Sequence, residues 1–185
     1  MSTLTPPVQL TPKDVERASV RDGKLYELIG GELKEKRVGF WELFTAQRII
    51  ERLNQQFYPH EGAAAGEVMV YCFKRANHGR KPDVVYVRNK QYAEGRIAEG
   101  DIYVVPHLVV EVLSPNNTGL EVDDKLEEYL EAGIPLVWIV NRDRRTIRVY
   151  RSDGTTHLFK GQDVIENEPL LPGFRLVAAD VFPAP

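Results

Sequence analysis

Apolar residues recur along the chain at spacings that predict three helices. Between residues 40 and 57 they fall three or four positions apart, which places them on one stripe of an amphipathic helix. The stripe comprises Phe40, Leu43, Phe44, Ile50, Leu53 and Phe57. A second helix is expected over residues 119–132, where a similar stripe stops at a glycine. A short helix is expected over residues 11–20, because Thr11 and Pro12 have the form of a helix start.

Short apolar runs predict the strands of a sheet. Residues 83–87 and 108–113 are apolar runs bounded by loops, as expected of strands that are buried on both faces. Residues 24–29 and 32–37 flank two glycines and indicate a hairpin, because glycine accepts the positive φ angles of tight turns. Further strands are expected over residues 67–73, 136–140, 146–151 and 156–160. This order of elements predicts a mixed α/β fold in which helices pack on a central sheet.

Length and composition are those of a globular protein. The chain has 185 residues, of which 43% are apolar and 28% charged, and we expect one domain over residues 1–185 with a loose arm over residues 1–10. No apolar run approaches the roughly 20 residues that cross a bilayer, and the N-terminus lacks the basic and apolar segments of a secretory signal. The single cysteine, Cys72, excludes an internal disulfide framework. These observations predict a cytoplasmic location without a membrane partner.

Most familiar catalytic motifs are absent from the sequence. It contains no GxGxxG, no Walker-type phosphate loop, no GxSxG and no HExxH. Its four histidines are widely separated, which disfavours a zinc site. The formal net charge of −3 argues against a protein that coats nucleic acid, although an enzyme needs only a local basic rim.

Two carboxylates stand in otherwise apolar strands. Glu111 lies in the middle of residues 108–113, and Asp83 begins residues 83–87. A buried carboxylate must be paired, protonated or bound to a cation. For Glu111 alone, a salt bridge to a buried Lys or Arg is an equally good explanation, and for Asp83 alone a cap on the preceding turn is a better one. Because the sequence shows no obvious fixed countercharge for the two together, they favour a shared divalent cation.

A set of ordered motifs surrounds these carboxylates. It consists of Pro82-Asp83, VEVLSP at 110–115, DKLEEY at 124–129 and GIPLVWIV at 133–140, with YELIGGEL at 26–33 and LPGF at 171–174. The set resembles the Uma-two family of the PD-(D/E)XK nuclease superfamily over nearly the whole chain. The resemblance implies a restriction-endonuclease-like fold, with a central mixed sheet flanked by helices. It also implies hydrolysis of phosphodiester bonds in DNA that depends on Mg²⁺ or Mn²⁺, with RNA left open as a substrate.

The resemblance assigns roles to three residues. Asp83 and Glu111 would be the metal ligands. The superfamily's lysine normally lies two residues beyond the acid, where this chain has Leu113. In the Uma-two pattern the lysine lies on the following helix, and Lys125 matches it. Lys125 would position the nucleophile or neutralise the charge of the transition state; a solvated helix lysine paired with Glu121 or Glu128 is the alternative interpretation.

Weaker candidates accompany these three. Glu121, where the family usually has Asp, and Tyr129 each lie four residues from Lys125 and are candidate supporting residues. Glu32 and Glu51 are candidates for a further acidic ligand, and plain surface charge explains both more simply. The basic run before Asp83 would touch backbone phosphates, although a solvated hairpin loop is an equally good explanation. Its cationic members are Lys74, Arg75, Arg80 and Lys81.

Two other functions stay open at this point. The fold could serve as a non-catalytic module for nucleic-acid binding or protein assembly, which the acidic net charge and Glu121 favour. A glycosidase with a carboxylate pair is the third hypothesis, but no aromatic sugar-binding platform flanks either acid in the sequence. For a nuclease we expect a homodimer, because the two strands of DNA require two cuts.

Overall fold

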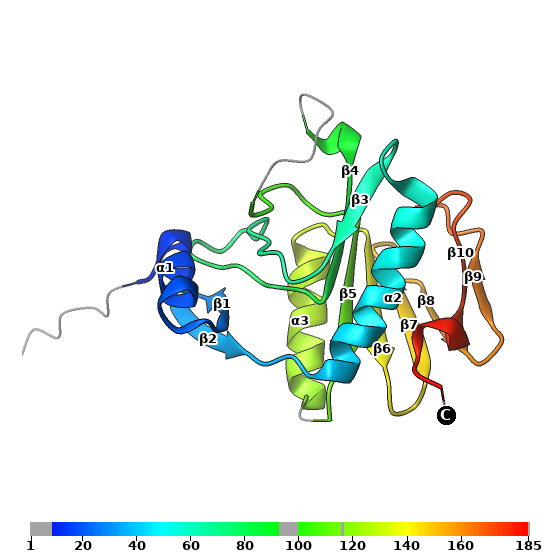
Figure 1. The fold of residues 1–185 in the computed structure, drawn as a ribbon. Coiled ribbons are helices and arrows are strands. Elements are labelled where there is room, and N and C mark those ends of the chain that lie inside the picture. Colours follow the sequence, from blue (N-terminus) through cyan, green and yellow to red (C-terminus); the bar gives the residue numbers. More distant parts are fainter. Residues whose placement is uncertain (1–8, 93–99, 116, 185) are drawn as a thin grey trace, which may run out of the picture.

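A six-stranded mixed sheet forms the centre of the protein (Figure 1). The computed structural model describes residues 9–92, 100–115 and 117–184. The strands, in spatial order, are β3 (Gly62–Ala65), β4 (Val84–Arg88), β5 (Leu108–Leu113), β6 (Leu136–Asn141), β7 (Thr146–Arg151) and β8 (Thr156–Lys160). Strands β5 and β6 are parallel, and the other neighbouring pairs are antiparallel. The strands from β4 to β8 match the sequence prediction to within one residue at each end.

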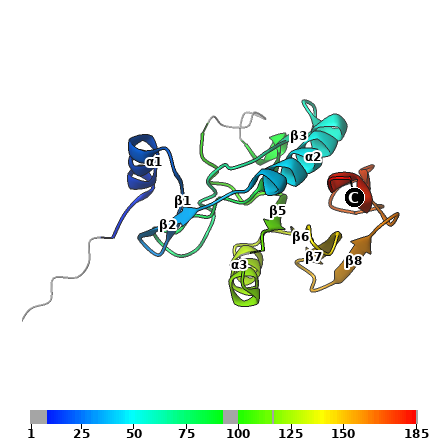
Figure 2. The same ribbon diagram turned by 60° about the horizontal axis from the view of Figure 1, so that its bottom comes forward.

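Helices cover both faces of this sheet, as Figure 2 shows. One face carries α2 (Phe40–Phe57) and the C-terminal elements β9 (Val164–Glu166), β10 (Arg175–Val177) and η2 (Ala178–Val181), and the other carries α3 (Gly119–Glu131). Along β5, Val110 and Val112 pack toward α2 whereas Val109 packs toward α3. Because strand side chains alternate, Glu111 faces the same side as α3. The mixed α/β fold predicted from the sequence is confirmed.

The N-terminal elements attach beside the sheet, next to α3 (Figure 1). They are α1 (Pro12–Asp22), β1 (Leu25–Ile29) and β2 (Glu32–Lys36), and the 3₁₀ turn η1 (Asn89–Gln91) follows β4. The predicted hairpin is confirmed, with Gly30 and Gly31 at φ 59° and 88° in its turn. Leu28 of β1 forms a two-way backbone bridge to Gly79, with N–O distances of 3.0 and 2.7 Å. This bridge brings the hairpin to the segment that leads into β4.

Residues 67–73 do not form the predicted strand. In the described part of the chain this segment makes isolated bridges only, from Val70 to Arg80 and to Ile102. Met69 packs with the hairpin and α1, and Val70 packs against β4. The apolar pattern of residues 67–73 therefore reflects burial between the N-terminal elements and β4, and not hydrogen-bonded pairing within a sheet.

The outer strand β3 was not predicted. Its sequence, Gly-Ala-Ala-Ala, has little strand propensity, because β-branched and aromatic residues favour strands. A Cβ on Gly62 would stand 2.3 Å from the carbonyl oxygen of Val87 and 2.9 Å from the Tyr86 ring. Small residues are thus needed for β3 to approach β4 closely. Because small residues have little strand propensity, the sequence does not indicate a strand here.

The predicted apolar stripe of α2 is only partly buried. Leu53 and Phe57 lie in the core, and Ile50 packs against it. The members of the stripe in the first two turns are exposed instead: Phe40, Leu43 and Phe44. Glu42 takes the inward position there and binds Arg142 at the β6–β7 turn, with 3.1 Å between Oε1 and Nη1. The first turn of α2 thus faces the end of the sheet, where a polar side chain is accommodated.

Residues 1–8 of the expected N-terminal arm lie outside the described residues. The backbone N–H of Leu10, at the end of the arm, donates to the carbonyl of Gly31 at 2.9 Å.

Among the helices of the described residues, none combines the length and apolar character needed to span a membrane.

Candidate active site

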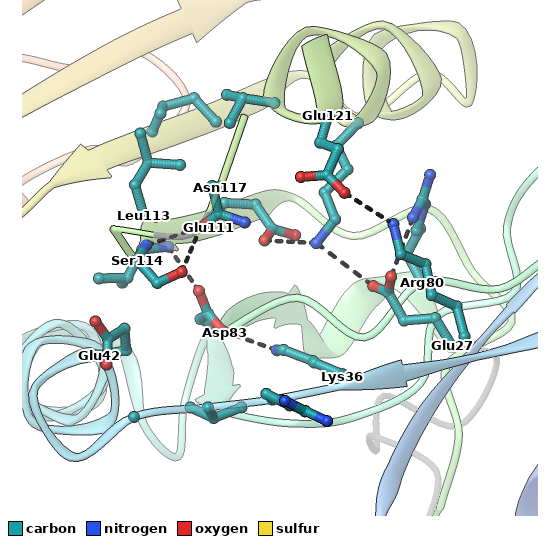
Figure 3. Close-up of a pocket in the computed structure, with 18 of the residues that line it drawn as sticks. Glu27, Lys36, Glu42, Arg80, Asp83, Glu111, Leu113, Ser114, Asn117 and Glu121 are labelled. Atoms are coloured by element: carbon teal, nitrogen blue, oxygen red, sulfur yellow. Dashed lines mark hydrogen bonds and ion pairs between the residues drawn. The ribbon is translucent and has the colours of Figure 1, made fainter. Parts of the chain in front are cut away.

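Two buried carboxylates stand opposite each other on neighbouring strands (Figure 3). Val84 of β4 is paired with Val110 of β5, so the next step of this antiparallel register sets Asp83 opposite Glu111. Opposed residues of antiparallel strands point to the same face. Both carboxylates line a cleft of about 670 Å³ between the hairpin, the start of α2 and α3. The structure thus brings together the two residues that the sequence singles out as metal ligands.

Asp83 is held by one backbone amide and one lysine. The N–H of Val112 donates to its Oδ2 at 2.6 Å, and Lys36 Nζ donates to its Oδ1 at 2.8 Å. Lys36 also donates to Glu67 Oε1 at 3.0 Å and to the carbonyl of Lys81 at 2.6 Å. Burial opposes the charge of Lys36, but the nearby carboxylates of Asp83, Glu111 and Glu67 outweigh it and raise the lysine pKa. Lys36 therefore stays charged beside Asp83.

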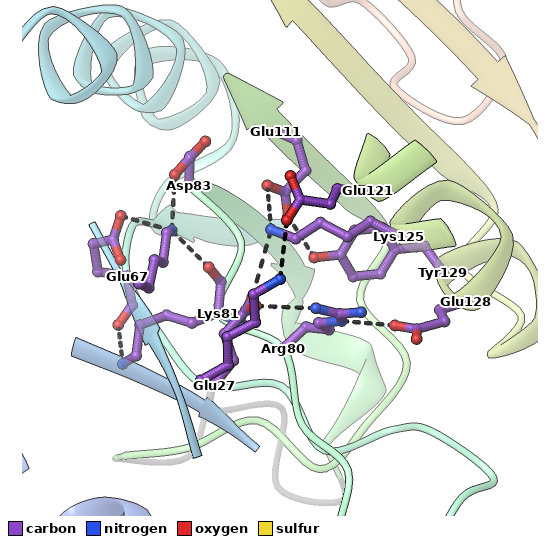
Figure 4. Close-up of polar contacts among 12 residues, drawn as sticks. Glu27, Glu67, Arg80, Lys81, Asp83, Glu111, Glu121, Lys125, Glu128 and Tyr129 are labelled. Atoms are coloured by element: carbon purple, nitrogen blue, oxygen red, sulfur yellow. Dashed lines mark hydrogen bonds and ion pairs between the residues drawn. The ribbon is translucent and has the colours of Figure 1, made fainter. Parts of the chain in front are cut away.

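Glu111 is held by two residues of α3 (Figure 4). Lys125 Nζ donates to its Oε2 at 2.9 Å, and the Tyr129 hydroxyl donates to its Oε1 at 2.5 Å. Lys125 and Tyr129 lie one helical turn apart, so both reach the same point. Burial raises the pKa of Glu111; the charge of Lys125 opposes the rise and that of Asp83 adds to it. A negative charge on Glu111 beside that of Asp83 is thus disfavoured at this point of the cleft.

A third buried carboxylate, Glu27 of β1, ties the hairpin to the same cluster. Its Oε2 accepts from Arg80 Nη1 at 3.0 Å, its Oε1 accepts from the N–H of Lys81 at 3.1 Å, and Lys125 Nζ lies 3.5 Å away. Burial opposes the ionised form of Glu27, yet Lys125 and Arg80 outweigh it and lower the pKa of Glu27. Arg80 is fixed in turn by Glu128 of α3, with 2.6 Å between Nε and Oε2. One network therefore joins the hairpin, the loop before β4 and α3.

These contacts correct one premise of the sequence argument. The sequence showed no obvious countercharge for Asp83 and Glu111, but the structure supplies Lys36 for the first and Lys125 for the second. The salt bridge considered for Glu111 is present. Lys125 is not the solvated helix lysine of the alternative interpretation, because it binds Glu111 and Glu27 inside the cleft. The pair alone consequently no longer requires a metal.

The charge balance and ligand chemistry of the cleft still suit a cation. Seven carboxylates line it: Glu27, Glu35, Glu42, Asp83, Glu111, Glu121 and Asp124. Five cationic side chains accompany them: Lys34, Lys36, Arg37, Arg80 and Lys125. Mg²⁺ is usually bound through one or two carboxylates, with water and substrate phosphates completing its shell. In the described residues no group of three or more His, Cys, Asp and Glu side chains is arranged to hold a metal. The donors that Asp83 and Glu111 offer are two carboxylates, the oxygen chemistry that Mg²⁺ and Mn²⁺ accept.

The other acidic candidates are divided between the cleft and the surface. Glu121 lines the cleft, pairs with Lys34 at 3.3 Å and caps α3 through Thr118. Glu32, beside the hairpin turn, is exposed and does not line the cleft. Glu51 is also exposed and pairs with Arg48 at 3.5 Å. The structure therefore separates Glu32 and Glu51 from the two central carboxylates.

The predicted basic rim is not one surface. Lys74 and Arg75 are exposed but do not line the cleft. Arg80 is buried in its contacts with Glu27 and Glu128, and Lys81 Nζ donates to the carbonyl of Glu67 at 2.8 Å. Arg80 lines the cleft as a structural cation, and the other three point elsewhere.

Several charged residues of the cleft were missed from the sequence, and three of them, Glu27, Lys36 and Glu42, have largely buried side chains. Glu27 carried a usable signal, since it is a charged residue inside a predicted strand, as Glu111 is. Lys36 carried none, because alternating charges fill β2 and only the docking of the hairpin brings its ammonium group to Asp83. Glu42 was hidden by the apolar residues around it, which predicted the opposite face of α2 as buried.

Comparisons with known proteins define the class. The protein has the restriction-endonuclease-like fold, because it is similar to the crystal structure of "a putative nuclease belonging to DUF820 from Anabaena variabilis" with a TM-score of 0.70. The two share 20% sequence identity, and the similarity covers 84% of this chain and 88% of that chain. The model of the Uma2 family, described as "Putative restriction endonuclease", matches residues 12–179. The chain therefore belongs to the Uma2 (Uma-two) family. No curated protein matches its sequence.

The network around Glu128 makes a pH-dependent contribution to stability that can be measured. Burial opposes its charge, but hydrogen bonds from His78 and Arg80 outweigh burial and lower the pKa of Glu128 to about 2. A depressed carboxylate pKa stabilises the fold above the unfolded pKa, and the contribution is lost as pH falls toward the folded pKa. We expect Glu128→Gln to lower the free energy of unfolding by about 1–2 kcal/mol at pH 6, less than the full pKa shift corresponds to, because solvent screens the partly exposed carboxylate.

Urea unfolding at several pH values checks this expectation. The difference between wild type and Glu128→Gln should fall to about half by pH 3, because the unfolded carboxylate is then protonated. Glu131→Gln is the matched control, since Glu131 is an exposed acid of the same helix. A difference that is independent of pH would show that Glu128 contributes through packing alone.

Proposed function

We propose that this protein is an endonuclease that hydrolyses phosphodiester bonds of DNA and uses Mg²⁺ or Mn²⁺. The observation that carries the proposal is the pair Asp83 and Glu111, opposed across β4 and β5 inside the cleft of a Uma2 domain. In this role Asp83 and Glu111 would hold one divalent cation. Such an ion would supply Lewis-acid polarisation of a phosphate and a nucleophile from water at neutral pH.

The surrounding residues supply orientation and charge. Tyr129 donates to Glu111 Oε1 and the N–H of Val112 donates to Asp83 Oδ2, so one oxygen of each carboxylate is held by a neutral donor and the other accepts from Lys125 or Lys36. Carboxylate oxygens have further lone pairs, and these remain for a cation. Lys125 carries its ammonium group to within 2.9 Å of Glu111 from α3. In the proposed role this charge does the work of the lysine that the superfamily carries on the strand, because charge stabilisation depends on a position in space and not on the element that carries the side chain.

A second function has one observation in its favour. Lys36 and Lys125 already neutralise Asp83 and Glu111, as they would in a catalytically degenerate domain that binds nucleic acid or assembles with proteins. In that case the ion pairs are structural and no cation enters. The excess of carboxylates over cationic side chains in the cleft favours the nuclease. RNA as a substrate belongs to the same proposal and is tested by the same assay. The homodimer expected for double-strand cleavage is also part of the proposal, and sedimentation analysis of the purified protein tests it.

A nuclease assay tests the proposal directly. Purified protein with Mg²⁺ or Mn²⁺ is incubated with plasmid, blunt duplex, single-stranded DNA and single-stranded RNA. We expect cleavage that stops in EDTA and falls by about 100-fold or more in Asp83→Asn, which removes a ligand charge but keeps the side-chain shape. Glu51→Gln, an exposed acid of α2, is the control. Asp83→Asn cleaving at the wild-type rate would exclude the proposed site.

Lys125 is expected to stabilise the transition state from α3. Lys125→Met keeps most of the stem and removes the charge, and it should lower the cleavage rate by roughly 10²–10³-fold. Because the change also leaves Glu111 and Glu27 without this ammonium group, urea unfolding must accompany the assay. Lys13→Met is the matched control, since Lys13 is an exposed lysine of α1 that does not line the cleft. If Lys125→Met is folded and cleaves like wild type, another cation, with Lys36 the nearest to Asp83, has the role.

A further inference from the structure

An exposed group of apolar side chains lies at the start of α2. Phe40, Trp41, Leu43 and Phe44 are 72%, 46%, 48% and 37% exposed, and we call these four residues the aromatic ridge. Such side chains normally pack inward from a helix of this kind. Here the inward face of the helix is formed by other residues, among them Thr45, Ile49 and Leu53. The ridge is therefore not a part of the core that became exposed at a loose end.

The rings of the ridge are ordered against one another. Phe40 and Trp41 meet edge to face with ring centroids 5.0 Å apart, and Trp41 and Phe44 do so at 5.8 Å. Each of these contacts uses the edge of one ring. Three rings at the surface of one helical turn provide flat apolar area for a ligand that itself has flat faces.

The ridge follows directly in the chain on residues that line the cleft. Gly39, the N-cap of α2, lines the cleft that contains Asp83 and Glu111, and so does the inward-facing Glu42. Arg37, with an 88% exposed side chain, precedes the ridge and also lines the cleft, as does Lys34. Lys34 pairs with Glu121 and Arg37 with Glu35, but both side chains are largely exposed, so cationic groups of the cleft and aromatic rings occur within one stretch of chain, residues 34–44. This combination fits a partner that carries phosphates and flat bases together.

We propose that the aromatic ridge stacks unpaired bases of a nucleic-acid strand whose backbone enters the cleft. The inference rests on the proposed nuclease function and specifies its substrate as single-stranded, or unpaired beside the cut. Every base has a π-face, so such stacking is tolerant of sequence. In a duplex the base faces are already stacked on one another, and the ridge gains nothing from them. A second copy of the chain would also cover apolar side chains, but it does not account for the cationic groups of the cleft in the same stretch of chain.

Trp41 makes binding measurable without cleavage. The chain has two tryptophans, and Trp138 is fully buried, so a change in fluorescence caused by a ligand reports on the ridge. In EDTA we expect a 12-nucleotide oligo-dT strand to quench Trp41, and added salt to weaken the binding. A blunt 12-base-pair duplex and inorganic phosphate should quench little at the same concentrations. Phe40→Ala and Phe44→Ala should each weaken oligo-dT binding by roughly 5–100-fold, the range for one lost stacking partner.

Leu158→Ala is the matched control, because Leu158 is an exposed apolar residue of β8, outside the ridge and the cleft. Equal affinity for strand and duplex, with no effect of Phe40→Ala, would overturn the inference. A dimer in sedimentation analysis that Phe40→Ala dissociates, with oligo-dT binding unchanged, would assign the ridge to contact between copies and also overturn it.

Cleavage separates this inference from the function on which it rests. If wild type with Mg²⁺ cuts blunt duplex and single strands at equal rates, and the ridge variants do too, the nuclease stands and the ridge inference falls. If oligo-dT quenches Trp41 as expected while no substrate is cut, the ridge inference stands and the nuclease falls. Cleavage that prefers single strands or unpaired ends, by a factor that Phe40→Ala reduces, supports both.

Discussion

The structure depends on one constraint: two carboxylates, Asp83 and Glu111, are buried next to each other where β4 and β5 pair. Asp83 and Glu111 lose water and repel each other, so the fold must deliver positive charge to both. The positive charge arrives from two directions, through Lys36 of the hairpin and Lys125 of α3. The hairpin is therefore fixed against the end of the sheet by its charges as well as by the apolar contacts of Leu28.

The sequence predicts the parts of this arrangement that depend on residues close together in the chain, and it does not predict contacts between residues far apart in the chain. The hairpin, α3 and the strands from β4 to β8 follow from local patterns, and a carboxylate inside an apolar strand identifies Glu111 without a structure. The contact of Lys36 with Asp83 spans 47 positions and no local pattern encodes it. The exposed start of α2 was missed because its apolar residues were assigned to the stripe that is buried further along the helix, at Leu53 and Phe57. Strand β3 was missed because its close approach to β4 requires small residues.

Lys36 and Lys125 also bear directly on the chemistry of the two carboxylates. An ammonium group and a divalent cation are alternative ways to offset the same carboxylates, and the cleft contains both the lysines and an excess of acid. If a cation enters, Lys125 keeps Glu27 as a partner at 3.5 Å and its charge becomes available to a phosphate. If none enters, the network of Glu27, Arg80 and Glu128 is a purely structural device that attaches the hairpin to α3. The family and the fold are the same in both cases, so the difference lies only in what the two carboxylates bind.

Calorimetric titration with Mn²⁺ therefore tests the central claim most directly. Mn²⁺ takes the same oxygen ligands as Mg²⁺ and needs no nucleic acid to be present. The account predicts one ion bound per chain by the wild type, with binding lost in both Asp83→Asn and Glu111→Gln and kept in Glu51→Gln, all four proteins being folded. Mn²⁺ binding that is unchanged in the two site variants, or absent from the folded wild type, would contradict the assignment of Asp83 and Glu111 as a metal site.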